Sequence, residues 1–295
     1  MLQKDRIYAL TIGDYKEGRG VRITELQCRF NVHKAADQKR KPAGATIEVY
    51  NLSKSTLDLL DSDYIQATLE VGYVATGLHK IVTGNVKEIS TRDHGTDTVT
   101  RILIGEAYSA LNQNRAGGTL PAGKTGEDFL EMIRGNMPGI AKGAYTGSGV
   151  KKVLPYGLPV NTTPKDALDE FCEANQLEWR VENNALYVTD QAGLVNKNKT
   201  TAPVISATTG MIGIPFRTTE KGKKIKGSKT RRKGVQFNAL LNASIAPGIL
   251  IYLLSEDIKG WYKINDVEYL GDYRGNDWYV SCFCSLVDDG DLLDD

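Results

Sequence analysis

The sequence has few of the residues that build metal centres and disulfide frameworks. It contains four cysteines and three histidines among 295 residues. The cysteines are too few and too scattered for a disulfide framework. Cys282 and Cys284 lie two residues apart in a strand pattern, but the neighbouring sequence offers no histidine or further cysteine to complete four metal ligands. We therefore expect buried structural thiols, no metal site and no cofactor.

Long apolar runs and a strong net charge are also missing. The apolar-leaning run near the N-terminus is too short for a signal peptide or a membrane span. A formal net charge of +1 gives the protein no overall field that would draw it to nucleic acid or to a membrane. We expect folding in a cytoplasm and no membrane insertion.

Strand patterns dominate the first part of the chain. Thr46, Glu48 and Tyr50 alternate with apolar residues, so one face of this strand can be buried while the other stays wet. A capped turn and a short helix are expected within NLSKSTLDLL, residues 51–60, followed by further strands. About seven strands before Tyr108 would be enough to close a small barrel, and we assign residues 1–110 to a first β-barrel domain.

The middle of the chain favours a small α+β domain at residues 111–195. Thr125 and Asp128 have the spacing of a capping pair for one helix, and Thr163 begins the best helix pattern of the chain. The segments LEWRV and ALYV then alternate around a tight turn, which predicts a hairpin packed on the helix. The glycine-rich residues 138–157 are typical of a loop, or of a hairpin at best.

The last part of the chain returns to strand patterns. Aromatic and β-branched residues dominate residues 196–290, with turns about every ten residues, which predicts a second barrel or a sandwich, and we assign the segment to a second β-barrel domain. Residues 291–295 are an acidic tail that we expect to be a soluble end. The expected fold is mainly β with an α+β insert: two small antiparallel β-barrel domains and a helix-and-hairpin domain between them.

One motif suggests nucleotide chemistry. Gly118, Gly123, Lys124 and Thr125 match the spacing of a Walker A loop, in which backbone amides cradle phosphates and the threonine hydroxyl binds Mg²⁺. A Walker A loop must follow a buried parallel strand, and the preceding residues ALNQNRAGG contain no apolar run. We interpret the match as a decoy, a glycine-rich turn with Thr125 capping the next helix. A nucleotide-dependent enzyme that uses this loop is kept as an alternative.

The sharpest polar feature is a basic segment at residues 221–233. It could contact DNA phosphates or an acidic partner through counterion release. The alternative is a solvated hairpin loop, because its glycines and single isoleucine cannot form a packed element. The candidate contact residues are Lys223, Lys224, Lys226, Lys229, Arg231, Arg232 and Lys233.

Three regions in this order resemble bacteriophage tail baseplate hub proteins. ATIEVYNLSKSTLDLL with LEVGY and IVTGNV looks like their first barrel, and DALDEFCEANQLEWRVENNALYVT is similar to their small inserted domain. GMIGIPFRT, GVQFNALLNASIAPGILIYL and KGWYKINDVEYLGDYRGNDWYVSCFCS resemble their second barrel. The basic segment is longer and more charged than the family leads us to expect, and the family does not use the Walker A match.

The resemblance implies a structural protein of the virion rather than an enzyme. Such a hub is a homotrimeric ring in the tail baseplate, assembled in the host cytoplasm, that joins the tail tube to the central spike and other baseplate proteins. It leaves a channel for genome ejection, so the basic segment would face DNA in the lumen or a neighbouring subunit. A carbohydrate- or protein-binding β module with an exposed aromatic patch is the other alternative. A role in the core or at an interface is the other interpretation of its candidate residues, which are Trp261, Tyr262, Tyr269, Tyr273 and Trp278.

Overall fold

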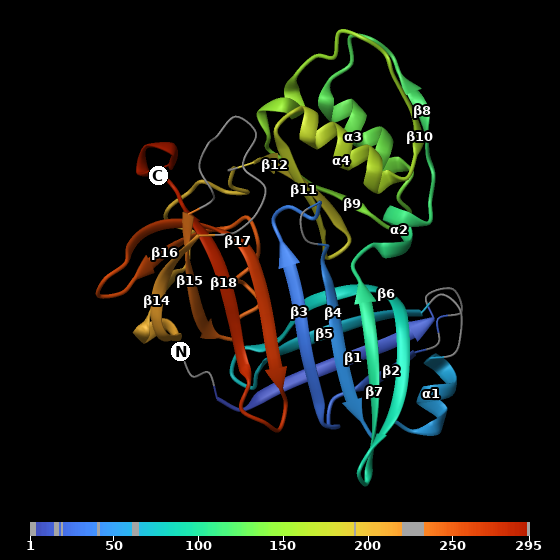
Figure 1. The fold of residues 1–295 in the computed structure, drawn as a ribbon, viewed down its shortest axis with the longest axis vertical. Coiled ribbons are helices and arrows are strands. Elements are labelled where there is room, and N and C mark those ends of the chain that lie inside the picture. The colour runs from blue at the N-terminus through green and yellow to red at the C-terminus, as the bar shows by residue number, and fades with distance from the viewer. Residues whose placement is uncertain are drawn as a thin grey trace.

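One sheet of thirteen strands, nearly all antiparallel, contains strands from both ends of the chain in this computed structural model (Figure 1). The structure describes residues 4–14, 18, 20–39, 42–60, 65–191, 193–219 and 233–293. The first part of the chain supplies β1 (Arg6–Asp14), β2 (Gly20–Ile23), β3 (Cys28–Ala35), β4 (Gly44–Tyr50), β5 (Ile65–Tyr73), β6 (Gly77–His94) and β7 (Asp97–Gly105). The last part supplies β13 (Val204–Ser206), β14 (Met211–Thr219), β15 (Lys233–Leu240), β16 (Leu250–Leu254), β17 (Lys259–Asp272) and β18 (Trp278–Leu286).

A smaller α+β unit, here called the insert, lies between these two sets of strands in the sequence and beyond one end of the sheet in space (Figure 1). Its helices are α2 (Tyr108–Asn112), α3 (Gly126–Gly135), η1 (Ser148–Lys151) and α4 (Pro164–Ala174). Its strands are β8 (Ala116–Leu120), β9 (Ala141–Tyr145), β10 (Leu158–Thr162), β11 (Leu177–Glu182) and β12 (Ala185–Asp190). The remaining helices are α1 (Lys54–Leu60), η2 (Ala207–Thr209) and η3 (Asp289–Asp291).

The predicted fold class is confirmed: the protein is mainly β with a small helical insert. The expected short helix is α1, where the Ser53 hydroxyl accepts a hydrogen bond from the Thr56 amide at 3.2 Å. The predicted caps also form, since the side chains of Thr125 and Thr163 accept bonds from the Asp128 and Asp166 amides. These caps satisfy amides at the helix starts that have no partner within the helix.

The prediction of a loop for residues 138–157 was wrong. This segment contains β9, which pairs in parallel with β12 and forms a three-stranded sheet with β11. A Cβ added at Gly143 would lie 2.5 Å from the Leu186 carbonyl oxygen, so glycine allows the close approach of the two backbones. The sequence hides this strand because glycine weakens the strand pattern at the position where the close packing requires it.

The strands β17 and β3 join the two β regions into one sheet. They pair antiparallel over seven residues of each strand, from Asp266 opposite Ala35 to Asp272 opposite Arg29. The buried apolar side chains of both regions form one continuous core that includes Phe30 and Trp278, whose rings meet edge to face with centroids 5.5 Å apart. A second core lies in the insert and extends from Ala107 to Val188. The described residues therefore form two large apolar cores, and a third, small cluster consists of Leu194, Leu250 and Leu292.

Candidate functional site

The Walker A match does not form a phosphate-binding loop. Gly118 lies in β8, which pairs antiparallel with β10, and Lys124 is exposed. The Thr125 hydroxyl donates to Asp128 Oδ2 at 2.9 Å and accepts from the Asp128 amide, so both groups are committed to the cap of α3. The Asp128 carboxylate thus lies where a phosphate would have to bind, and it would repel one.

The basic segment falls almost wholly outside the described residues. Lys223, Lys224, Lys226, Lys229, Arg231 and Arg232 belong to the gap between β14 and β15, and Lys233 is the first residue of β15. Its contact with DNA or with a partner stays a prediction.

The aromatic residues expected for a carbohydrate-binding patch are core residues. Tyr262, Tyr269 and Trp278 are buried, and Trp261 and Tyr273 are partly buried against the cores. They therefore do not form an exposed aromatic surface.

The four cysteine thiols lie in the interior of the protein. All four cysteines are buried and free, and burial raises the pKa of each thiol above its ordinary value. Within the described residues there is no group of three or more histidine, cysteine or acidic side chains that could hold a metal ion. Across the same residues, every helix is too short or too polar to span a membrane.

The polar face of the sheet that contains Thr46, Glu48 and Tyr50 carries a row of charged side chains. The strand register places Asp272, Arg29, Glu48 and Arg101 side by side across β17, β3, β4 and β7, with alternating sign. Arg29 Nε lies 2.8 Å from Asp272 Oδ2, and this ion pair connects the two β regions. Opposite charges on facing strand positions stabilise the pairing. The mixed charge makes this face a poor match for DNA, which binds surfaces with excess positive charge.

An apolar strip lies on β14, at one edge of the large sheet. Ile212, Ile214 and Phe216 are exposed, with Ile214 retaining 77% of its accessible surface. The strand pairs with β15, and its pairing register shifts between Ile212 and Phe216. Pro215 has no amide hydrogen to donate, so the irregular edge disfavours the simple addition of another strand. The strip is therefore suited to side-chain packing.

The most unusual polar site is a layer of charges between the two cores. Along β11, Leu177, Trp179 and Val181 belong to the insert core, while Glu178 and Arg180 alternate to the other side of the strand. Glu178 and Arg180 are nevertheless only 1% and 4% exposed. Their side of β11 is buried because it faces the large sheet.

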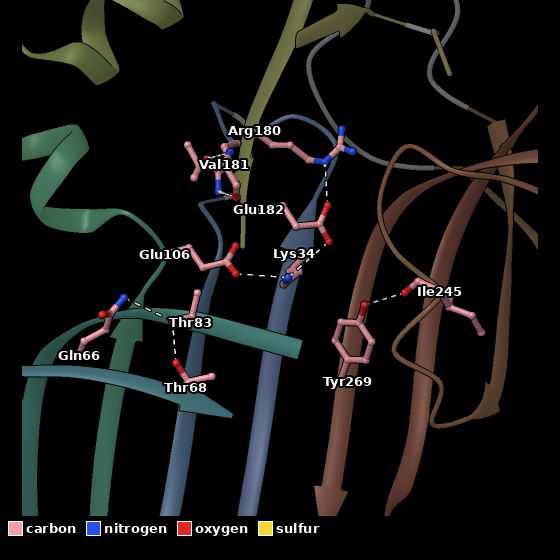
Figure 2. A network of polar contacts seen from close by, with 11 residues as sticks. Lys34, Gln66, Thr68, Thr83, Glu106, Arg180, Val181, Glu182, Ile245 and Tyr269 are labelled. Carbon is pink, nitrogen blue, oxygen red and sulfur yellow. Dashed lines mark hydrogen bonds and ion pairs between the residues drawn. The ribbon is translucent and has the colours of Figure 1, made fainter. Parts of the chain in front are cut away.

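The sheet supplies the opposing charges. Lys34 continues the inward-facing alternation of β3, and Glu106 continues that of β7. Lys34 Nζ lies 3.2 Å from Glu106 Oε1 and 3.5 Å from Glu182 Oε1, and Arg180 Nε lies 3.3 Å from Glu182 Oε2 (Figure 2).

A second buried ion pair and a glutamine complete the layer. Lys263 of β17 donates to Glu178, which also accepts a bond from the Thr189 hydroxyl at 3.3 Å. The Gln38 side chain bonds both the amide and the carbonyl of Val181, at 3.0 and 3.2 Å. We call the six charged residues the polar seam: Lys34, Glu106, Glu178, Arg180, Glu182 and Lys263.

Burial and neighbouring charges shift the pKa values of Glu106 and Lys34. Desolvation raises the pKa of Glu106 from 4.5 to about 7, although Lys34 lowers it in part. Burial lowers the pKa of Lys34, but the charges of Glu106 and Glu182 outweigh this effect and hold it above its ordinary value. Lys34 therefore stays charged, and Glu106 is the group of this pair that can change its protonation near neutral pH.

The seam residues were not predicted as a site from the sequence. The sequence nevertheless contained a signal of this site, because Lys34 and Glu106 occupy positions in phase with the buried apolar residues of their strands. A charged residue in such a phase indicates a buried partner.

Comparisons with known proteins identify solved structures that share this fold. A scan against protein-family models and a search of the curated proteins find no match. Among solved structures, the tail protein from Neisseria meningitidis MC58 is 11% identical with a TM-score of 0.63, covering 97% of this chain and 98% of that one. The 43 kDa tail protein of prophage MuSo2 from Shewanella oneidensis is 8% identical with a TM-score of 0.62, covering 98% of this chain and 100% of that one.

This chain has the fold of phage tail proteins. The E. coli c3393 protein shares this tail-protein fold at 9% identity and a TM-score of 0.60, covering 89% of this chain and 74% of that one. It is described as a component of the type VI secretion system with structural similarity to the T4 bacteriophage tail proteins gp27 and gp5. The resemblance to tail baseplate hub proteins is thus confirmed at the level of the fold, along nearly the whole chain.

Proposed function

We propose that the protein is a structural subunit of a phage tail baseplate, a hub that forms a homotrimeric ring between the tail tube and the central spike. The ring leaves a channel for the genome, and the subunit acts by assembly rather than by catalysis. Residues 1–110, 111–195 and 196–290 are its three domains, with the tail at residues 291–295. The observation that carries the proposal is the match to tail proteins over 97–98% of the chain.

The strip on β14 supports assembly into a ring. Large apolar side chains exposed together on one strand mark surfaces that partners cover. Because β14 forms one edge of the large sheet and β2 ends the opposite side, a subunit presents two different edges. Contacts between unlike surfaces of identical subunits generate a closed ring when the rotation closes.

Molar mass in solution tests the proposal. We expect a trimer by light scattering, and loss of the trimer when Ile214 and Phe216 are both changed to serine. Tyr156→Ser is the matched control, because Tyr156 is 78% exposed but lies in the insert, away from β14. A strict monomer at all concentrations of the unmodified chain would contradict the ring. A trimer that survives the double substitution would retain the ring and exclude β14 as its contact.

The basic segment is proposed to contact DNA in the channel or a neighbouring subunit. Its charges would neutralise phosphates or acidic side chains, and such contacts weaken as salt concentration rises. Replacing Lys223, Lys224, Arg231 and Arg232 by serine is expected to impair genome delivery or assembly. Normal assembly together with normal delivery in phage particles that carry the variant would contradict this contact.

A further inference from the structure

We propose that the polar seam is a pH-gated hinge, at which loss of a proton from Glu106 loosens the attachment of the insert to the large sheet. The proposal is independent of the ring, because it concerns contacts within one chain. Two apolar cores meet here through a layer of buried charges instead of through continuous apolar packing. A boundary of this kind favours local opening, in which the insert separates from the large sheet while each keeps its own core.

Glu106 lies at the covalent entrance to the insert. It follows the last residue of β7 and precedes Ala107, which has φ 49° and ψ 26°. This left-handed conformation is unfavourable for alanine and persists only where its surroundings impose it. A titratable carboxyl and a strained backbone residue are therefore adjacent at the point where the chain enters the insert.

Charged and polar groups surround Glu106 on several elements. Glu106 is only 4% exposed, and when its carboxyl is ionised the cost of its burial outweighs its attraction to Lys34. When Glu106 gains a proton, Lys34 keeps Glu182 as its partner and one buried charge disappears. The groups that face Glu106 are Lys34 of β3, the Thr83 backbone of β6, Glu182 with Arg180 behind it on β11, and Tyr269 of β17.

The sign follows from the raised pKa of Glu106. The docked seam holds the proton more tightly than a solvated carboxyl does, so docking is most stable below the ordinary pKa of 4.5. This stabilisation is lost as pH rises through about 7, and docking changes no further above that pH. The docking of the insert on the large sheet is therefore more stable at acidic pH than at neutral or alkaline pH.

Hydrogen exchange of the β11 amides measures the opening. After correction for the intrinsic exchange rate, we expect the opening equilibrium of β11 in the intact chain to rise on the order of fiftyfold between pH 5 and pH 8. Glu106→Gln, which stays neutral, should remove this dependence. Glu173→Gln is the matched control: it removes a largely exposed ion pair with Lys39 that also connects the sheet side to the insert, and it should keep the wild-type pH profile.

Three results would overturn the hinge. The first is β11 exchange that does not depend on pH in the unmodified chain, and this arm needs no variant to fold. The second is an unchanged pH profile in Glu106→Gln. The third is an equal rise in β1 and β2, which lie beyond β5 in the strand order of the sheet, because that result would indicate unfolding of the whole chain.

Discussion

Replacing Gly271 by alanine tests the pairing of β17 with β3, the contact that makes one sheet from two β regions. Gly271 lies opposite Phe30 in the register of the two strands. A Cβ at Gly271 would lie 2.7 Å from Phe30 Cε2 and closer still to Cζ and Cε1. Real Cβ atoms do not approach other atoms this closely, so either the ring or the strand must move.

The ring has little room to move. Phe30 is 5% exposed and packs edge to face against Trp278. Overpacking a tightly filled core costs about 1–3 kcal/mol. Because the clash involves three atoms of a buried ring, we expect Gly271→Ala to lower the free energy of unfolding by about 2–3 kcal/mol. Urea unfolding, followed by the tryptophan signal, measures this loss.

A second substitution separates the clash from other effects. Phe30→Leu removes the three ring atoms that the new methyl group meets. The double variant should therefore be more stable than the sum of the two single losses predicts, by at least about 1 kcal/mol. Gly117→Ala is the control, because a Cβ there meets nothing within 4 Å. A neutral Gly271→Ala, or strictly additive losses in the double variant, would refute the reasoning.

Three further predictions concern stability. Tyr269→Phe removes a buried hydroxyl that donates a hydrogen bond to the Ile245 carbonyl at 2.6 Å, so the free energy of unfolding should fall by about 1–2 kcal/mol. An unchanged free energy of unfolding in urea would contradict the value assigned to this bond. Thr163→Ala removes the N-cap of α4 and should lower the free energy of unfolding by about 1 kcal/mol. Thr163→Ser keeps a hydroxyl at the cap and should retain most of this stability in thermal melts. An equal loss of stability in both variants would contradict a contribution from the cap. For Glu106→Gln, urea midpoints should show that the stability of the natural chain falls relative to the variant by about 2–3 kcal/mol as pH rises from about 5 to about 7. The reason is that the folded chain keeps a proton on Glu106 that the unfolded chain has already lost in this range, so folding takes up a proton. Parallel pH profiles would contradict this.

Local chemistry made much of the fold predictable. Short segments carried the signals that were interpreted correctly: the alternation in β4, the cap pairs at Thr125 and Thr163, and the glycine-rich boundaries. The expected strand and the two expected helices are present in the structure. The order of these segments also indicated the tail-protein fold. The strand β9 was missed because its glycine serves a backbone contact with a distant residue, Leu186.

The candidate site was less predictable because it depends on which surfaces meet. The sequence by itself determined that β11 has an apolar face and a charged face, since side chains alternate along a strand. It could not show that the charged face is buried, because the opposing charges come from residues as far away in sequence as Lys34 and Lys263. Only the tertiary structure brings these residues against Glu182 and Glu178, and the loss of water around them is what moves the titration of Glu106 toward neutral pH.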